Sequence, residues 1–245
     1  YGAVVSPGAC QLALTLNAAA LALRQEQELQ VTDIIWPQPL VISAEKKQTV
    51  QALLRPEAVN GHGPHYSVQL ISFAADEAVS SETTTTTHLT ATVMVAAAPS
   101  ASVIDLAALR QHCTQCLDVA AFYKGLAATQ IELGSSFRWI QALWCSPQPT
   151  TDDAGRQVLA QLDCPETLQT SGHLLHPGLL DACFQVTGTV RTNSPEAETL
   201  LPFALDSLHL HRAASGNRLW CHATQVGPQR WDMQLLTEDG EIVAT

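Results

Sequence analysis

The chain has 245 residues, of which 46% are hydrophobic and 14% are charged, and its formal net charge is −11 at pH 7. A chain of this length and composition can bury a sizeable core, so it suits one large globular domain or two fused small ones. The acidic balance argues against nucleic-acid binding, and no apolar stretch reaches the roughly 20 residues that a membrane-spanning helix needs.

The first half of the chain reads as one apolar helix followed by strands. After Pro7 and Gly8, leucines and alanines recur at three-to-four-residue spacing from Ala9 to Arg24, which predicts a helix. This helix is apolar almost all round, so we expect other structure to wrap it. Strand-like patterns follow over residues 31–42, 48–55, 66–74 and 88–96.

The second half repeats this order in altered form. Residues 97–101 read as a linker, 105–129 carry helical spacing, and 179–190 form a second apolar helix. Strands are predicted over residues 137–145, 157–162, 208–211, 219–224, 231–236 and 241–244. The sequence therefore predicts two helix-plus-sheet units in tandem.

The segment from His176 to Gln185 reads HPGLLDACFQ and closely resembles the H-P-x-L-L-D-A-x-x-Q signature of polyketide synthase dehydratases. Three further segments resemble motifs of that family in matching order: the end of H-x-x-x-G-x-x-x-x-P-G-A over residues 2–9, Y-G-x-x-F over residues 133–137, and L-P-F over residues 201–203. The resemblance thus extends over essentially the whole chain.

The resemblance implies an α+β double hotdog, in which each unit is a curled antiparallel sheet around a central helix. We expect an N-terminal hotdog over residues 1–97, a linker with a helix over 98–130 and a C-terminal hotdog over 131–245. The implied reaction is dehydration of a 3-hydroxyacyl thioester, which an acyl carrier protein delivers on its phosphopantetheine arm. No cofactor of its own is expected, and the implied partners are neighbouring synthase domains and a second copy of the chain.

Dehydration needs a base for the α-proton and an acid for the departing hydroxyl. The resemblance assigns the acid to Asp181 and the base to a histidine four residues before Gly2, which is outside this sequence. The sequence also stops within what resembles the last strand, so we expect both ends to be trimmed.

An acid that works near neutral pH needs a raised pKa, and Leu179, Leu180 and Phe184 suggest an apolar setting that would raise the pKa of Asp181. The positive end of the helix dipole would lower it, so desolvation must dominate. Gln185 lies on the same helical face, four residues on, and the family match gives it the role of orienting the carboxyl.

Substrate contacts are expected at both helix starts. Backbone N–H groups of Gly8 and Ala9 could polarise the thioester carbonyl, although Pro and Gly also begin ordinary helices. The other expected contacts are Leu133, Phe137, Pro177, Leu180 and Phe184. Leu133 replaces the tyrosine of the family's Y-G motif, which removes a hydroxyl from the expected pocket.

The remaining histidines do not form a predicted site. His176 is expected to shape the loop before its helix. His209 and His211 alternate on a strand without a visible third ligand, so metal binding is not predicted. His62 and His65 fall in a turn-rich loop, where solvent exposure is expected.

Seven cysteines, an odd number without dense pairing, favour free thiols in a reducing compartment, and the absence of a secretory leader makes the cytoplasm the default location. Cys113 and Cys116 form a C-x-x-C, which we interpret as half-buried helix cysteines because no second ligand pair accompanies it.

Two alternatives stay open beside dehydration. A related hotdog enzyme could shift a double bond or close an oxygen ring, and a relic without activity could serve as a scaffold. Asp181 and Gln185 favour dehydration, because an isomerase needs no acid for a departing hydroxyl.

Overall fold

The structure is a computed structural model of the chain. It describes residues 4–24, 28–43, 47–57, 65–74, 84–96, 103–129, 131–147, 155–166, 168–191 and 203–245. The chain divides into two compact units, one of residues 1–98 with 201–210 and one of residues 99–200 with 211–245. His62, Leu201 and Pro202 lie outside the described residues.

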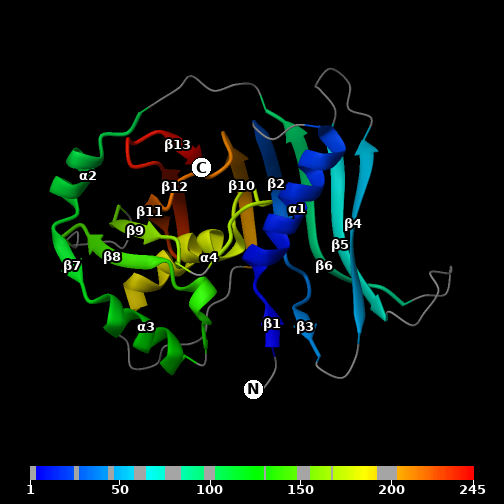
Figure 1. Cartoon of the computed structure of the whole chain (residues 1–245), viewed down its shortest axis with the longest axis horizontal. Coiled ribbons are helices and arrows are strands. Elements are labelled where there is room, and N and C mark those ends of the chain that lie inside the picture. The colour runs from blue at the N-terminus through cyan, green and yellow to red at the C-terminus, as the bar shows by residue number, and fades with distance from the viewer. Residues whose placement is uncertain are drawn as a thin grey trace. The chain divides into compact units, whose positions relative to one another are not determined.

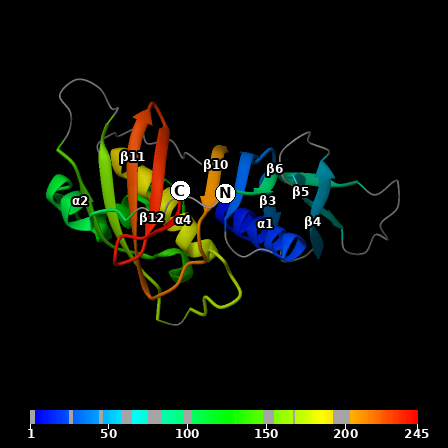
Figure 2. The same cartoon turned by 90° about the horizontal axis from the view of Figure 1, so that it is seen from above.

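The first unit is an antiparallel sheet with one long helix against it. The helix is α1 (Gly8–Leu23), and the strands follow the order β4 (Gln48–Glu57), β5 (His65–Ala74), β6 (Thr86–Val95), β2 (Leu29–Ile35) and β10 (Ala204–Leu210). Figures 1 and 2 show α1 lying along one side of these strands, where it buries Leu12 and Leu16 completely. The predicted apolar helix therefore supplies the core of this unit.

The predicted strand over residues 31–42 is wrong as one element, because it is two strands. β2 ends at Ile35, and β3 (Leu40–Ile42) pairs separately with β1 (Val4–Ser6). Pro37 and Pro39 lie between them and have no N–H to donate to a ladder, which explains the break.

The second unit also builds its sheet from antiparallel strands. Their order is β13 (Ile242–Ala244), β12 (Arg230–Leu236), β11 (Arg218–Gly227), β9 (Gln157–Asp163), β8 (Ile140–Cys145) and β7 (Gln115–Leu117). Its helices are α2 (Leu106–His112), α3 (Val119–Ala128) and α4 (Pro177–Gln185), with 3₁₀ turns η1 (Ser135–Phe137) and η2 (Val186–Arg191).

The single helix predicted over residues 105–129 is wrong, because α2, β7 and α3 occupy this stretch. Asp105 and Asp118 each cap a separate helix, and each carboxylate accepts two backbone N–H groups of the following turn. Cys113 is accordingly not a half-buried helix residue but the buried C-cap of α2, and Cys116 is exposed on β7. None of the seven cysteines, all of which the structure describes, forms a disulfide bond.

The unit boundaries also differ from the expected ones. Residues 201–210 belong to the first unit, because β10 pairs with β2 from Ala204↔Ile35 to Leu210↔Leu29. The expected linker of residues 98–130 is instead packed into the second unit, where Cys113 joins a buried cluster with Leu159, Trp220 and Leu236.

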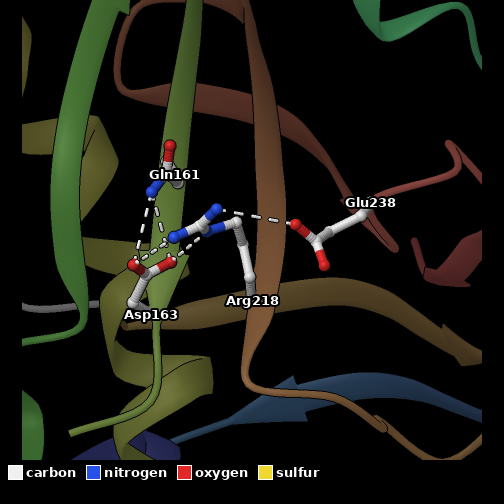
Figure 3. A network of polar contacts seen from close by, with 4 residues as sticks. All are labelled: Gln161, Asp163, Arg218 and Glu238. Atoms are coloured by element: carbon white, nitrogen blue, oxygen red, sulfur yellow. Dashed lines mark hydrogen bonds and ion pairs between the residues drawn. The ribbon is translucent and has the colours of Figure 1, made fainter.

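An ionic network joins β9 to β11 in the second unit (Figure 3). Arg218 donates to both carboxylate oxygens of Asp163, over 2.8 and 3.0 Å, and Gln161 donates to the same carboxylate over 3.3 Å. Glu238 lies 3.7 Å from Arg218. The bidentate pair fixes the end of β9, the strand that flanks β8. Among the described residues, no helix is both long and apolar enough to span a bilayer.

Candidate active site

The start of α4 is fixed by His176. Its side chain is the N-cap, and Nδ1 accepts the backbone N–H of Gly178 over 3.0 Å. Because Nδ1 accepts, the proton of the neutral ring lies on Nε2. Burial and the neighbouring His173 lower the pKa of His176, which favours this neutral form. The geometry agrees with the structural role expected for His176.

Gly178 allows α4 to pass very close to η1. A Cβ at this position would lie 2.1 Å from the carbonyl oxygen of Ser136 and 2.5 Å from Nε1 of Trp139. The same Trp139 nitrogen donates to Ser136 O over 2.9 Å. Glycine is therefore required where the helix crosses the backbone of residues 135–139.

Asp181 and Gln185 form a pair on one face of α4. Nε2 of Gln185 donates to Asp181 Oδ2 over 2.6 Å and to the carbonyl oxygen of Phe137 over 3.0 Å. Both N–H groups of the Gln185 amide are thus used. Because both partners are acceptors, the atom that faces them is the amide nitrogen and not the oxygen. Gln185 Oε1 is buried and has no partner among the described residues.

The environment of Asp181 disfavours its charged form. Burial raises the pKa of Asp181, and the hydrogen bond from Gln185 only partly opposes that rise. Asp181 is the fifth residue of α4, and the helix dipole falls off within the first turn. Desolvation therefore outweighs the opposing effects, in the direction that the apolar neighbours of Asp181 predict.

The other residues expected around the carboxyl in this unit divide into two groups. Leu180 is buried, whereas Leu133, Phe137, Pro177 and Phe184 are half-buried. Phe137 contributes its backbone carbonyl to Gln185, and the carbonyl of Leu133 accepts Nε of Arg138 over 3.1 Å. Leu133 and Phe137 thus take part through their backbone carbonyls, whereas the sequence predicts contacts of their side chains with the substrate.

Gly8 and Ala9 are in the first turn of α1 in the other unit. The first N–H groups of a helix have no intrahelical acceptor, so they remain candidates for holding a developing oxyanion. A Cβ at Gly8 would lie 3.0 Å from Cε2 of Trp36, so packing alone also favours glycine at this position.

Tyr123 on α3 was missed by the sequence analysis. Its Oη accepts the backbone N–H of Ile140 over 3.1 Å. Burial is the largest cause that raises the pKa of Tyr123 to about 12, and the charge of Asp181 adds to the rise. The sequence signal for Tyr123 is that a tyrosine follows the buried Phe122 on a helix, because a buried tyrosine hydroxyl usually has a hydrogen-bond partner.

Three further histidines lie in or directly beside strands. His209 Nε2 lies 3.4 Å from Oε2 of Glu28, and His211 follows the last residue of β10. His65 is not in a loop as expected, because it begins β5 and pairs with Met94 of β6.

Two family models match the chain. One, described as "polyketide synthase dehydratase N-terminal domain", matches residues 103–245, and the other, described as "polyketide synthase dehydratase domain", matches residues 1–73.

Among curated proteins, the chain is 24% identical to polyketide synthase PksN of Bacillus subtilis and 25% identical to polyketide synthase ThaG of Burkholderia thailandensis. These matches cover 98% and 100% of the chain but 4% of each relative, so both relatives are much longer proteins. Among solved structures, an inactive His-to-Phe variant of the CurJ dehydratase in complex with a compound is 32% identical. It superposes with a TM-score of 0.87 over 100% of this chain and 81% of its own.

Proposed function

Because this chain belongs to the polyketide synthase dehydratase family and has its double hotdog fold, we propose that it dehydrates a 3-hydroxyacyl thioester to the 2,3-enoyl thioester. The observation that carries this proposal is the buried carboxyl of Asp181, which has a raised pKa and is held by Gln185. A carboxyl that stays protonated can donate to a leaving hydroxyl.

The reaction breaks two bonds of the substrate and forms one double bond. A base takes the proton from C2, the C2–H electron pair becomes the second bond of C2=C3, and the C3–O bond breaks. Asp181 gives its proton to the departing hydroxyl, which leaves as water. The family resemblance assigns the base to the histidine expected four residues before Gly2, and the N–H groups of Gly8 and Ala9 would stabilise charge on the thioester oxygen.

The hydrogen bond from Gln185 divides the roles of the two carboxyl oxygens. Oδ2 of Asp181 is occupied by Nε2 of Gln185, so Oδ1 is the oxygen that carries and delivers the proton. After delivery, the same amide N–H stabilises the carboxylate that remains. Gln185 therefore orients the acid before the proton transfer and supports its conjugate base afterwards.

Delivery of the substrate follows from the same proposal. The acyl group would arrive on the phosphopantetheine arm of an acyl carrier protein, and the domain would need no cofactor of its own. Its curated relatives are large polyketide synthases, which supports a place beside other synthase domains. We further propose a homodimer and a cytoplasmic location.

The decisive experiment uses a protein that contains this chain with its natural flanking sequence. It is incubated with a panel of 3-hydroxyacyl carrier thioesters, and loss of water is followed by mass spectrometry. The parent should form enoyl products, whereas Asp181→Asn should lower kcat by about 10²–10⁴-fold, the usual contribution of a general acid.

Asp105→Asn is the matched control, because Asp105 caps α2 and asparagine caps a helix equally well. Equal rates for the parent and Asp181→Asn would overturn the role of Asp181. An active product with a moved double bond or an oxygen ring would instead support the related enzymes, and no product from any substrate would support the scaffold.

A further inference from the structure

We propose that Tyr123 is a positioning residue for the acid Asp181, and that it acts through the backbone of residues 137–140 and through Gln185. The inference rests on the proposed function, because it assigns a further residue to the same reaction. The contacts that carry it all lie in the second unit.

Two hydrogen bonds hold the two ends of the segment 137–140. At its start, the carbonyl oxygen of Phe137 accepts Nε2 of Gln185 over 3.0 Å. At its end, the N–H of Ile140 donates to Oη of Tyr123 over 3.1 Å. Movement of Ile140 away from Tyr123 would therefore displace the acceptor that holds Gln185, and Gln185 in turn holds Asp181.

The side of β8 that the N–H of Ile140 faces explains why a side chain is needed there. The carbonyl oxygen of Trp139 accepts the N–H of Asp163 on β9, so the N–H of Ile140, at the other side of the same trans peptide, points away from β9. On that side, β7 pairs with β8 no further than Leu143, and Ile140 lies beyond the end of this pairing. The hydroxyl of Tyr123 supplies the acceptor at this point.

Packing of α3 keeps the hydroxyl in place. Phe122 is 4% exposed, and its ring meets that of Tyr123 edge-on, with 5.4 Å between centroids. Phe122 and Leu126 both lie 3.7 Å from where a Cβ would be at Gly188 in η2, the turn that continues α4. One helix thus contacts both the segment that holds Gln185 and the continuation of the helix that carries Asp181.

The charge arrangement is consistent with this role. Burial raises the pKa of Tyr123 to about 12, so its phenol stays neutral near neutral pH. Arg138, which lies between Phe137 and Ile140 in sequence, places its guanidinium carbon 5.6 Å from the Tyr123 ring centroid. The ring is therefore held by contacts that a phenylalanine would largely keep, so removal of the hydroxyl isolates the hydrogen bond.

The test compares Tyr123→Phe with Tyr66→Phe, the same chemical change on β5 of the first unit. Tyr123→Phe should lower kcat about tenfold with little change in KM, because positioning of the acid acts on the transition state. The hydrogen bond from Gln185 lowers the pKa of Asp181, so a loosened Gln185 should move the alkaline limb of the kcat profile to higher pH. A merely structural role would leave this limb in place.

A double variant shows whether Tyr123 acts through Gln185. In the Gln185→Ala background, Tyr123→Phe should change kcat by less than about twofold, because the link it supports is already absent. If Tyr123→Phe does not fold, 3-fluorotyrosine at position 123 keeps the ring and hydroxyl but weakens the acceptor, and should shift the limb in the same direction.

The two proposals fail differently. A parent protein that forms no enoyl product overturns the dehydratase function. An active parent whose kcat and pH profile are unchanged by Tyr123→Phe, or changed equally by Tyr66→Phe, overturns only the role of Tyr123. Full tenfold loss in the Gln185→Ala background also overturns it.

Discussion

Gln185 Nε2 lies 2.6 Å from Asp181 Oδ2, one helical turn along α4. The same nitrogen donates to Phe137 O, so one amide joins the carboxyl of Asp181 to the backbone that crosses the start of the helix. Burial raises the pKa of Asp181, and this amide both holds the position of the carboxyl and partly offsets that rise.

Replacement of Gln185 should separate these two effects. Gln185→Ala should lower kcat about 10- to 100-fold, because the carboxyl loses its fixed orientation. It should also move the alkaline limb of the kcat profile to higher pH, since the interaction that lowers the pKa of Asp181 is gone. Steady-state kinetics between pH 5 and 9 measure both kcat and the position of the alkaline limb.

Gln161→Ala is the matched control, because Gln161 also donates to a carboxylate, that of Asp163, but on β9. An unchanged limb in Gln185→Ala would contradict the assignment of that limb to Asp181.

Gly178 should tolerate no side chain. Gly178→Ala would place its Cβ 2.1 Å from Ser136 O, and relief of this overlap should cost about 1–3 kcal/mol or more of unfolding free energy. Gly125→Ala, at an exposed position of α3, meets nothing within 4 Å and should instead stabilise by about 0.5–1 kcal/mol. Urea unfolding curves compare the two, and equal midpoints would refute the close approach.

His176 should make stability depend on pH. Nδ1 accepts an N–H only while the ring is neutral, and the folded protein lowers the pKa of His176 below its ordinary 6.5. The unfolded chain then binds the proton more readily, so this contribution is present above pH 6.5 and is lost as pH falls through the folded pKa.

The variants of His176 test this dependence. His176→Ala should cost about 1 kcal/mol at pH 8, and His176→Asn, which keeps a capping side chain, should cost less. Urea unfolding of His176→Asn should show a weaker loss of stability between pH 7 and 5 than the parent. An identical pH dependence would exclude His176 as its source.

The periodic elements were predictable from the sequence. The helix expected from Ala9 to Arg24 is observed at Gly8–Leu23, because an apolar run at helical spacing without interior breakers specifies its own length. The division of residues 105–129 into two helices and a strand was not predicted, although Asp105 and Asp118 are both residues that commonly cap helices. Apolar residues keep helical spacing past both capping residues. The break between the two helices is visible only in the structure, where β7 pairs with β8.

The site shows the same division. The contact between Asp181 and Gln185 was predictable, because residues four apart on a helix lie on the same face. The carbonyl of Phe137 and the hydroxyl of Tyr123 could not be placed, because a backbone acceptor has no sequence signature. The N–H of Ile140 bonds to Tyr123 beyond the point where the pairing of β7 with β8 ends, and the sequence does not show where that pairing ends.

Titration of the Asp181 carboxyl by ¹³C NMR, with the signal assigned by its absence in Asp181→Asn, measures the pKa on which the proposed acid role depends. We expect a midpoint above 3.8, the ordinary value of an aspartate, and a further rise in Gln185→Ala. A midpoint at or below 3.8 would show that the carboxyl is charged near neutral pH, and would contradict its proposed role as the acid.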